Sequence, residues 1–456
     1  MNTLPNHYLQ GAHIVNEGKI QTLDVEIREG KIKALHVPGQ QAPPADLPIT
    51  SLKGKYLLPG LIDDQVHFRE PGLTHKGCIK TESAAAVAGG ITSFMEMPNV
   101  VPPTLSAEKL EEKMAIAARD SHANYSFFLG ASNENLEAVL AADPTRFCGL
   151  KIFMGSSTGN MLVDHEGVLR ELFSRFKGII ALHCEDEGEV RARQQQYRCI
   201  YGENVPIQAH PHIRNHAACL KSSQKAVQLA QETDAHIHIL HISTAVETQL
   251  FSPGPLDFKK ITSEACIHHL YFTDADYSRL GSRIKWNPAV KTAYDRDMIW
   301  QALHDGRIDI IATDHAPHTW EEKSNTYFSC PSGGPLVQHG LLAMLEMAQK
   351  GFCDLPFLVE KMCHHPALRF QVKNRGFIRP GYYADLVAVD LSEETHVTPE
   401  SLLCRVKWSP FDGHVFPAKI TSTWVNGELA WDGESLNPNV RGMRLETGAA
   451  HLSSPR

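Results

Sequence analysis

The chain has 456 residues, of which 42% are hydrophobic and 21% charged, and this composition indicates a folded globular protein. Its formal net charge of −8 gives no reason to expect a nucleic acid or an anionic membrane as a partner. The N-terminus lacks the pattern of a secretory signal, and no apolar run of about 20 residues could span a bilayer, so we expect a cytoplasmic protein. The 10 Cys form no CxxC pair, which predicts reduced thiols, with Cys148, Cys184 and Cys266 as small core residues.

The first part of the chain, from about residue 8 to residue 55, is predicted to consist of short strands and turns. The stretch "DVEIREGKIKAL" alternates apolar and polar residues around Glu29 and Gly30, which is the pattern of a β-hairpin.

From Leu57 the pattern changes to short apolar runs that alternate with amphipathic helical stretches. The runs are "YLLPGLID", "ITSFMEMPN", "NYSFFLGAS", "GLKIFMG", "GIIALHCED", "AHIHILHIST", "KKITSEAC" and "RIDIIATD". Eight strand candidates separated by helices predict an α/β fold, a (β/α)8 barrel of the TIM type, over residues 57–375.

After about Arg375 the sequence again has the pattern of β-strands. The stretches "GFIRPGYYADLVAVDL" and "AKITSTWVNGELAWDG" carry strand alternation and Gly turns. The economical arrangement is one small β domain, built from residues 1–56 and 376–456 together, that flanks the barrel.

Polar side chains follow the apolar runs at the positions where a barrel carries its functional residues, the carboxyl ends of the strands. They include several His, an Asp and a Lys within a strand, and the set is Gln65, His67, Arg69, Asn99, Lys151, His183, His241, Asp314 and His318. Imidazole and carboxylate ligands on a rigid rim suit Zn²⁺ or a similar divalent ion. The remaining His of note are predicted to be surface or packing residues: His212, His216, His236, His238, His268, His269, His364 and His365.

Each of these residues also has an ordinary structural explanation. A single His at a strand end is more often a hydrogen-bonded part of the scaffold, Asp314 could cap the following helix, and Lys151 could belong to a buried ion pair. Separate scaffold roles would not all select the same rim, so the joint placement favours a site.

Arg69 lies two residues after His67, so strand alternation directs both side chains the same way. An Arg fork beside a metal suits a substrate carboxylate. The alternative is a salt bridge between Arg69 and a neighbour such as Glu70.

Together these residues and motifs resemble the amidohydrolase superfamily and, within it, the class I dihydroorotases. The resemblance covers nearly the whole chain and is carried by "GKYLLPGLIDDQVHFREPG", "GGITSFMEMPN", "LKIFMGSSTGN", "ALHCED", "ILHIST", "NPAVK", "IIATDHAPH" and "GFIRPGYYADLVAVDL". It implies a metal-dependent hydrolase that reversibly opens the ring of dihydroorotate to N-carbamoyl-aspartate, a reaction of de novo pyrimidine biosynthesis.

The resemblance also implies roles for individual residues. The implied zinc ligands are His67, Lys151, His183, His241 and Asp314, with Lys151 carboxylated by CO2 so that it bridges two ions. Asp314 would also be the catalytic proton shuttle. The implied substrate contacts are Arg69, Asn99, Asn287 and His318, together with Ser332 and Gly333 in the loop "SCPSGGP".

The chain departs from the pattern of the resemblance at Gln65, where the first His of an HxH pair is expected. A Gln oxygen is neutral and a weaker donor to Zn²⁺ than imidazole, so Gln65 is a weak ligand or none. We therefore expect a firm ion at Lys151, His183 and His241 and a weaker second ion at His67 and Asp314. Gln338 stands where many relatives carry Glu.

Two other functions remain open on the sequence. One is a non-catalytic, dihydroorotase-like partner of a transcarbamoylase, and the other is a hydrolase of another cyclic ureide, as in allantoinases and hydantoinases. The resemblance implies a homodimer. Arg69 argues against the neutral cyclic ureides, and the substrate-shaped set that remains around it argues against a purely structural role.

Overall fold

The computed structural model describes residues 5–155 and 161–447, so the SSTGN segment of the motif "LKIFMGSSTGN" lies outside the described residues. Within these ranges eight parallel strands pair in chain order: β6 (Leu61–Val66), β7 (Ile91–Glu96), β8 (Asn124–Gly130), β9 (Gly149–Phe153), β10 (Ile180–His183), β11 (Ile237–Ile239), β12 (Ile261–Cys266) and β13 (Ile310–Ala312). The two outer strands meet where Val66 bridges His315 and where His67 N donates to the His315 carbonyl at 2.7 Å. The predicted (β/α)8 barrel is confirmed.

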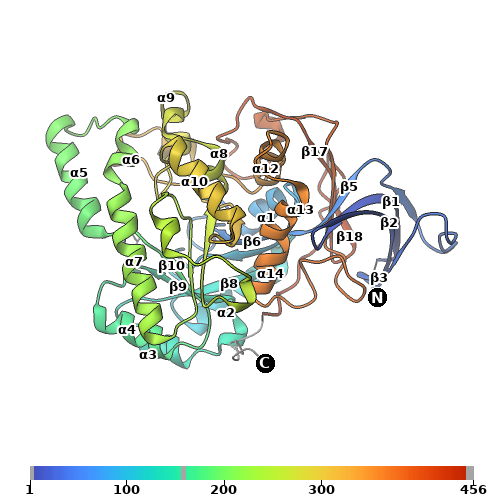
Figure 1. The fold of residues 1–456 in the computed structure, drawn as a ribbon, viewed down its shortest axis with the longest axis horizontal. Coiled ribbons are helices and arrows are strands. Elements are labelled where there is room, and N and C mark those ends of the chain that lie inside the picture. The colour runs from blue at the N-terminus through green and yellow to red at the C-terminus, as the bar shows by residue number, and fades with distance from the viewer. Residues whose placement is uncertain (1–4, 156–160, 448–456) are drawn as a thin grey trace.

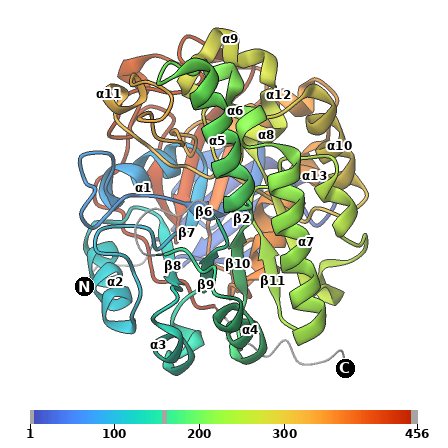
Figure 2. The same cartoon turned by 90° about the vertical axis from the view of Figure 1, so that its left-hand side faces the viewer.

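Helices surround these strands, as Figure 2 shows for β6 to β11. The α-helices are α1 (Ile79–Ala88), α2 (Ala107–Asp120), α3 (Leu136–Ala141), α4 (Glu166–Arg175), α5 (Glu187–Tyr201), α6 (His210–Ile213), α7 (His216–Thr233), α8 (Ile267–Tyr271), α9 (Tyr277–Leu280), α10 (Ala293–His304), α11 (Trp320–Lys323), α12 (Gly340–Gln349), α13 (Leu355–Val359) and α14 (His365–Arg369). Short 3₁₀ turns are η1 (Pro144–Arg146), η2 (Ile207–Ala209), η3 (Glu247–Leu250), η4 (Leu256–Phe258), η5 (Asp274–Asp276), η6 (Gly281–Ile284) and η8 (Pro399–Ser401), and η7 (Glu360–His364) is a π-helical turn.

Helix α2 illustrates how the sequence sets a helix and its buried face. The Ser106 hydroxyl accepts a hydrogen bond from Lys109 N at 3.3 Å and so caps the first turn. Leu110, Met114 and Ala117 then recur at helical spacing and are buried. Because helices of this kind cover the outside of the barrel, strands β6 to β10 are buried along their whole length. This burial explains why their sequences are nearly continuous runs of apolar residues.

A second sheet joins the two ends of the chain and lies to one side of the barrel (Figure 1). Its strands, in spatial order, are β18 (Glu428–Trp431), β17 (Lys419–Val425), β14 (Leu386–Asp390), β5 (Tyr56–Pro59), β1 (His7–Asn16), β2 (Lys19–Arg28) and β3 (Lys31–His36), and β4 (Ile49–Ser51) pairs with β1. Strands β15 (Thr395–His396) and β16 (Val415–Phe416) form a separate small pair. A sheet made from both chain ends is confirmed, while the exact domain limits at 56/57 and 375/376 stay a prediction.

The predicted hairpin is present between β2 and β3. Glu29 and Gly30 both have positive φ, 51° and 75°, as the tight turn of a two-residue hairpin requires.

The apolar run "YLLPGLID" differs from the sequence prediction because it forms two strands. Residues before Gly60 make β5, which pairs with β14 of the second sheet, and residues after it make β6 of the barrel. Gly60 N donates to the Asp385 carbonyl at 2.8 Å, and a Cβ at this position would lie 2.2 Å from Thr92 Oγ1. The chain therefore crosses between the sheets at a point where only glycine fits.

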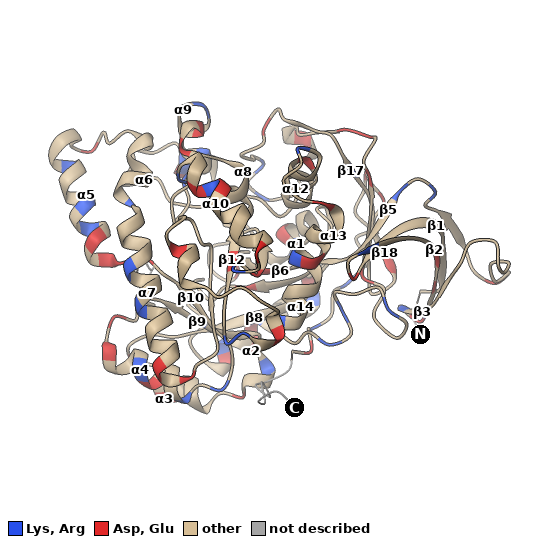
Figure 3. Ribbon diagram, viewed as in Figure 1, with Lys and Arg blue, Asp and Glu red and all other residues tan. Residues whose placement is uncertain are grey.

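The outer surface carries charges of both signs. Lys and Arg lie among Asp and Glu along α5 and α10 (Figure 3). Among the described residues no helix combines the length and apolar character needed to cross a membrane. Cys148, Cys184 and Cys266 are buried, as predicted.

Candidate active site

A cavity of about 660 Å³ opens at the carboxyl ends of the barrel strands. It brings together every residue that the sequence proposed for the site: Gln65, His67, Arg69, Asn99, Lys151, His183, His241, Asn287, Asp314, His318, Ser332 and Gly333. The His assigned to surface or packing roles are not among its lining residues. The roles of the residues around the cavity stay predictions; their convergence is an observation.

His183 and His241 face each other across the floor of the cavity. His183 Nδ1 lies 3.0 Å from His241 Nε2, and both rings are buried. Burial lowers the pKa of His183, and it lowers the pKa of His241 well below its ordinary value with help from His183 and Lys151. These two ring nitrogens are 3.0 Å apart, and two nitrogen ligands of tetrahedral zinc with bonds of about 2.0–2.1 Å are roughly 3.3 Å apart. This pair fits a zinc ion.

His67 and Asp314 form a second group of donor atoms. His67 Nε2 lies 3.2 Å from Asp314 Oδ1, while His67 Nδ1 lies 2.8 Å from the Asn99 side-chain oxygen. The Asn99 oxygen can only accept, so Nδ1 carries the proton and Nε2 is left as a donor atom for a metal. Burial raises the pKa of Asp314 to about 7, although Lys151, His183 and Arg69 oppose that rise.

Lys151 reaches the same place from β9 and is buried, with Nζ 4.6 Å from the centre of the Phe153 ring. Burial lowers the pKa of Lys151 to about 8, against the opposing charges of Glu264 and Asp314. A lysine with a lowered pKa offers the neutral amine that reaction with CO2 requires.

Gln65 lines the cavity and is 1% exposed. Its Oε1 accepts a contact of 3.3 Å from Cys266 Sγ. The side chain therefore already has a protein partner on the oxygen that would serve as a metal ligand.

The backbone of the rim is strained at three of the predicted site residues. Arg69, His241 and Asp314 have φ of 71°, 43° and 49°, in the left-handed region that non-glycine residues rarely occupy. Such conformations cost on the order of 1–3 kcal/mol each and gather at functional sites.

Arg69 is buried and held by neutral groups on one wall of the cavity. Its Nε donates to the Pro317 carbonyl at 3.0 Å, and its Nη2 lies 3.0 Å from His318 Nε2. The alternative, a salt bridge between Arg69 and Glu70, is not formed: Glu70 instead accepts a hydrogen bond from Ile79 N at 2.9 Å. Burial lowers the pKa of Arg69 to about 10, which leaves it cationic at neutral pH.

The loop that carries Ser332 and Gly333 is held from below by two buried lysines. Lys323 Nζ donates to the carbonyls of Pro331 and Gly333 at 3.0 and 2.8 Å, and Lys285 Nζ donates to the Tyr327 carbonyl at 2.7 Å. Gly333 has φ of 123°, and a Cβ there would lie 2.4 Å from the Ala316 carbonyl. These contacts fix the loop against the cavity.

Sequence reasoning missed two charged residues beside the site. Glu185 Oε2 lies 3.2 Å from His183 Nε2 and also pairs with Arg214, while Lys76 Nζ lies 3.1 Å from His318 Nδ1. The spacing HCED, with Glu185 two residues after His183, carried a signal that could have identified the first. Lys76 lies in a loop, where no periodicity indicates direction.

Gln338 lies away from the cavity lining. Its Nε2 donates to the Ser401 carbonyl at 2.7 Å and its Oε1 accepts from Leu403 N at 2.8 Å. The residue joins the segment before α12 to the loop at residues 401–403.

Comparison with known proteins places this architecture in a family. A family profile described as "Amidohydrolase family" matches residues 56–430, so the chain belongs to the amidohydrolase family. That family is generally metal-dependent and, in the part this chain resembles, consists of hydrolases of cyclic amides.

The names of individual relatives refer to several different substrates. The chain is 31% identical to a dihydroorotase of Halobacterium salinarum, over 91% of this chain and 97% of that protein. It is 29% identical to an allantoinase of Bacillus velezensis, over 93% of each chain. Among solved structures it resembles the L-hydantoinase (dihydropyrimidinase) of Arthrobacter aurescens, with a TM-score of 0.90, 25% identity, and coverage of 97% of this chain and 100% of that one.

Proposed function

We propose that the protein is a zinc-dependent dihydroorotase that reversibly hydrolyses (S)-dihydroorotate to N-carbamoyl-L-aspartate in de novo pyrimidine biosynthesis. The observation that carries the proposal is Arg69, a buried guanidinium in the cavity wall held by the Pro317 carbonyl and His318. A guanidinium fork in such a setting favours a substrate that brings its own carboxylate. Dihydroorotate carries that carboxylate and allantoin does not.

The residues at the rim fit two zinc ions of unequal strength. Lys151, carboxylated by CO2, would bridge them; His183 and His241 would complete the firm site, and His67, Asp314 and a weak Gln65 the other. Zinc bound here would polarise the ring carbonyl and lower the pKa of a water from 15.7 to about 7.

The protein's own groups would then bind the substrate and move the proton. An oxygen of the Asp314 carboxylate accepts the proton of the attacking water and transfers it to the ring nitrogen that leaves. In ring closure the same carboxylate returns the proton to water. The substrate contacts proposed are Arg69, Asn99, Asn287, His318, Ser332 and Gly333.

The main competitor is hydrolysis of another cyclic ureide, which the allantoinase and hydantoinase relatives support. The second is a non-catalytic partner of a transcarbamoylase. We favour a homodimeric enzyme because the resemblance implies it and because the residues around the cavity keep chemistry that packing alone does not require.

The test is to purify the protein without added metal, measure zinc per chain, and assay dihydroorotate, allantoin and hydantoin on the same sample. Dihydroorotate should be the preferred substrate. Arg69→Met should lower kcat/KM for it by about 100-fold, equal to the roughly 1.5–3 kcal/mol of a hydrogen bond to a charged group. Arg296→Met, on the surface of α10, serves as the matched control.

Other outcomes select the competitors. A metal-free, inactive protein that zinc does not rescue would point to a structural partner. Zinc-dependent hydrolysis of allantoin or hydantoin with dihydroorotate untouched would keep the machinery and replace the substrate.

A further inference from the structure

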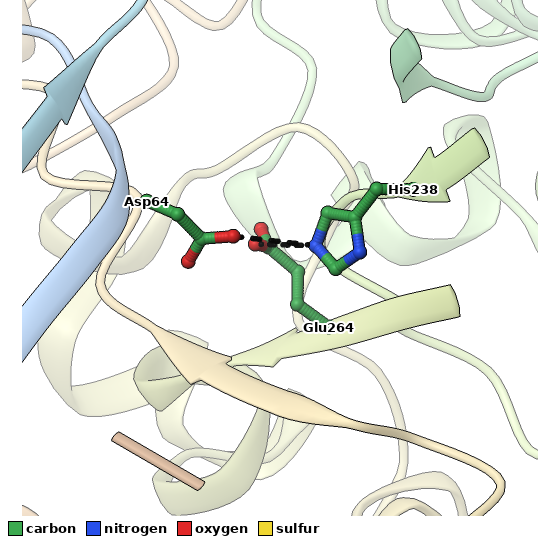
Figure 4. A group of neighbouring side chains, drawn as sticks. All are labelled: Asp64, His238 and Glu264. Carbon is green, nitrogen blue, oxygen red and sulfur yellow. Dashed lines mark hydrogen bonds and ion pairs between the residues drawn. The ribbon is translucent and has the colours of Figure 1, made fainter. Parts of the chain in front are cut away.

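Below the floor of the cavity, inside the barrel, lies a polar cluster that the rim chemistry does not use. It consists of Asp64 on β6, His238 on β11 and Glu264 on β12, all fully buried (Figure 4). The three side chains come from different strands and point at one another, with their donor atoms within 4.8 Å. Glu264 Oε1 also accepts from His241 N at 3.2 Å, which places the cluster directly beneath the rim pair.

The tautomer of His238 follows from its neighbour Thr262. The Thr262 hydroxyl donates to the Ile237 carbonyl at 3.3 Å, so its oxygen accepts from His238 Nδ1 at 2.9 Å. With the proton on Nδ1, a neutral ring directs the lone pair of Nε2 toward Asp64 and Glu264. A lone pair facing two carboxylates is repulsive unless Nε2 binds a proton or a metal cation; burial opposes the proton, but Asp64 and Glu264 raise the pKa of His238 to about 9.

A proton on His238 Nε2 would satisfy Glu264 but would still leave the Asp64 carboxylate without a hydrogen bond. His238 Nε2 is 3.2 Å from Glu264 Oε2, to which it can donate, and 3.3 Å from Asp64 Oδ2, with which it makes only an ion pair. Neither oxygen of Asp64 accepts a hydrogen bond from any residue in the described parts of the chain. A buried carboxylate without donors is expensive and calls for a bound cation or a proton.

A divalent metal ion would satisfy the whole cluster at once. Two carboxylates and a neutral imidazole carry a charge of −2, which one such ion neutralises. The distances of 3.2 and 3.3 Å from His238 Nε2 to the two oxygens match the roughly 3.3 Å edge of a tetrahedron with 2.0–2.1 Å bonds. A chain of contacts links the cluster to the cavity lining, because Cys266 Sγ lies 3.3 Å from Gln65 Oε1 and 3.7 Å from Glu264 Oε1.

We propose that Asp64, His238 and Glu264 bind a divalent metal ion of the Zn²⁺ or Mn²⁺ type inside the barrel, one layer below the rim and separate from the ions proposed there. This site does not depend on which cyclic amide the enzyme hydrolyses. It adds a structural cation that ties three strands of the barrel together.

The experiment removes the rim imidazoles and counts zinc. A protein with His67→Asn, His183→Asn and His241→Asn is incubated with Zn²⁺, desalted and measured by mass spectrometry for zinc per chain. It should retain one zinc, and its thermal midpoint should rise when Zn²⁺ is added. Adding Asp64→Asn should remove both effects, whereas Asp63→Asn, which changes a neighbouring buried carboxylate bonded to Thr313, should leave both.

Retention of the same zinc after Asp64→Asn, or no zinc in the rim variant, would overturn the proposal and assign the cluster to shared protons. Circular dichroism checks that each variant is folded. If the rim variant does not fold, the comparison uses the otherwise unaltered protein, in which Asp64→Asn should lower zinc by one per chain; an unchanged count there is equally decisive against the site. Neither readout involves catalysis, so a failure here is distinct from a wrong substrate.

Discussion

Gln65 stands where the resemblance implies a His ligand, and its side chain still fills that position in the cavity wall. Its oxygen contacts Cys266 Sγ, and the side chain remains buried in the cavity wall. A neutral amide oxygen competes poorly with imidazole for zinc, so in the proposed rim site one ion would bind more weakly while the other ligands stay in place.

Replacing Gln65 with His should strengthen the weaker zinc at the rim. The expected result is more zinc retained per chain after dialysis against a chelator, because imidazole is the better donor. Gln65→Asn, which keeps an amide but shortens the side chain, is the matched control. Equal zinc in the Gln65→His protein and the unaltered protein would show that residue 65 is not a ligand position.

Glu185 orients His183 from behind. With Glu185 Oε2 3.2 Å from His183 Nε2, the carboxylate holds that ring nitrogen and leaves Nδ1 facing His241. Glu185→Gln should weaken zinc affinity by about 10–100-fold, as loss of such supporting partners typically does. Competition with a chromophoric chelator measures this, and Glu187→Gln, at the partly exposed start of α5, should have no comparable effect. Unchanged affinity would reduce Glu185 to a partner of Arg214.

At the scale of elements, Asp295 near the start of α10 joins that helix to the start of α7 and to the loop after β11. Asp295 accepts from Thr292 N at 3.2 Å and from Ala245 N at 2.9 Å, and its carboxylate lies 2.9 Å from His216 Nε2 at the start of α7. Burial opposes ionisation, but His216 and these donors outweigh it and lower the pKa of Asp295 from 3.8 to about 2. The carboxylate therefore locks two helices and a loop in its charged form.

Asp295→Asn should destabilise the protein by about 1–2 kcal/mol at pH 7. Because the folded pKa lies below the unfolded one, this stabilisation is present above about pH 4 and is lost as the pH falls through 2. Urea denaturation at pH 7 and near pH 2.5 should show the difference between the two proteins shrinking at the lower pH. Asp297→Asn, an exposed change on the same helix, is the control; a pH-independent difference would contradict the assignment.

At the scale of the whole molecule, one buried group joins the barrel to the sheet of the chain ends. Asp385, just before β14, pairs with Arg375, accepts from Asn426 N at 2.7 Å and accepts from the Asn124 side chain of β8 at 3.2 Å. Both charged partners are nearly fully buried. The two sheets are therefore linked through a polar contact as well as through the chain at Gly60.

Asp385→Ala should lower the free energy of unfolding by about 3–5 kcal/mol, because it leaves the buried Arg375 without its carboxylate partner. Chemical denaturation followed by fluorescence and circular dichroism measures the loss. Asp390→Ala, at the other end of β14, tests the same change where the carboxylate is partly exposed and accepts hydrogen bonds from Ser392. A loss below about 1 kcal/mol at Asp385 would mean that solvent reaches Arg375 without cost.

The barrel and the rim could be predicted because both depend on local pattern. Each strand followed by a helix is visible in the periodicity, and the parallel arrangement then brings residues such as Lys151 and Asp314 to one edge. The sequence could not divide "YLLPGLID" at Gly60, since both halves are equally apolar and only the pairing with β14 separates them.

The cluster of Asp64, His238 and Glu264 could not be predicted from the sequence, for a different reason. Strict alternation would direct Asp64 away from the side that Gln65 and His67 share, but β6 has an irregular register between Asp63 and Val66. His238 and Glu264 are far from Asp64 in sequence, and their paired strands β11 and β12 come close to β6 only in the closed barrel. The sequence therefore predicts His238 only as a surface or packing residue.

The close approach at Gly60 also has a genetic consequence. Every missense change that a single base can make in a glycine codon introduces a residue with a Cβ, and here that atom would lie within 2.2–2.8 Å of three side-chain atoms of the fully buried Thr92. The codon can drift only among its synonymous forms unless position 92 changes with it. At the crossing between the two sheets, the contact between Gly60 and Thr92 therefore restricts which mutations are tolerated, independently of the chemistry of the cavity.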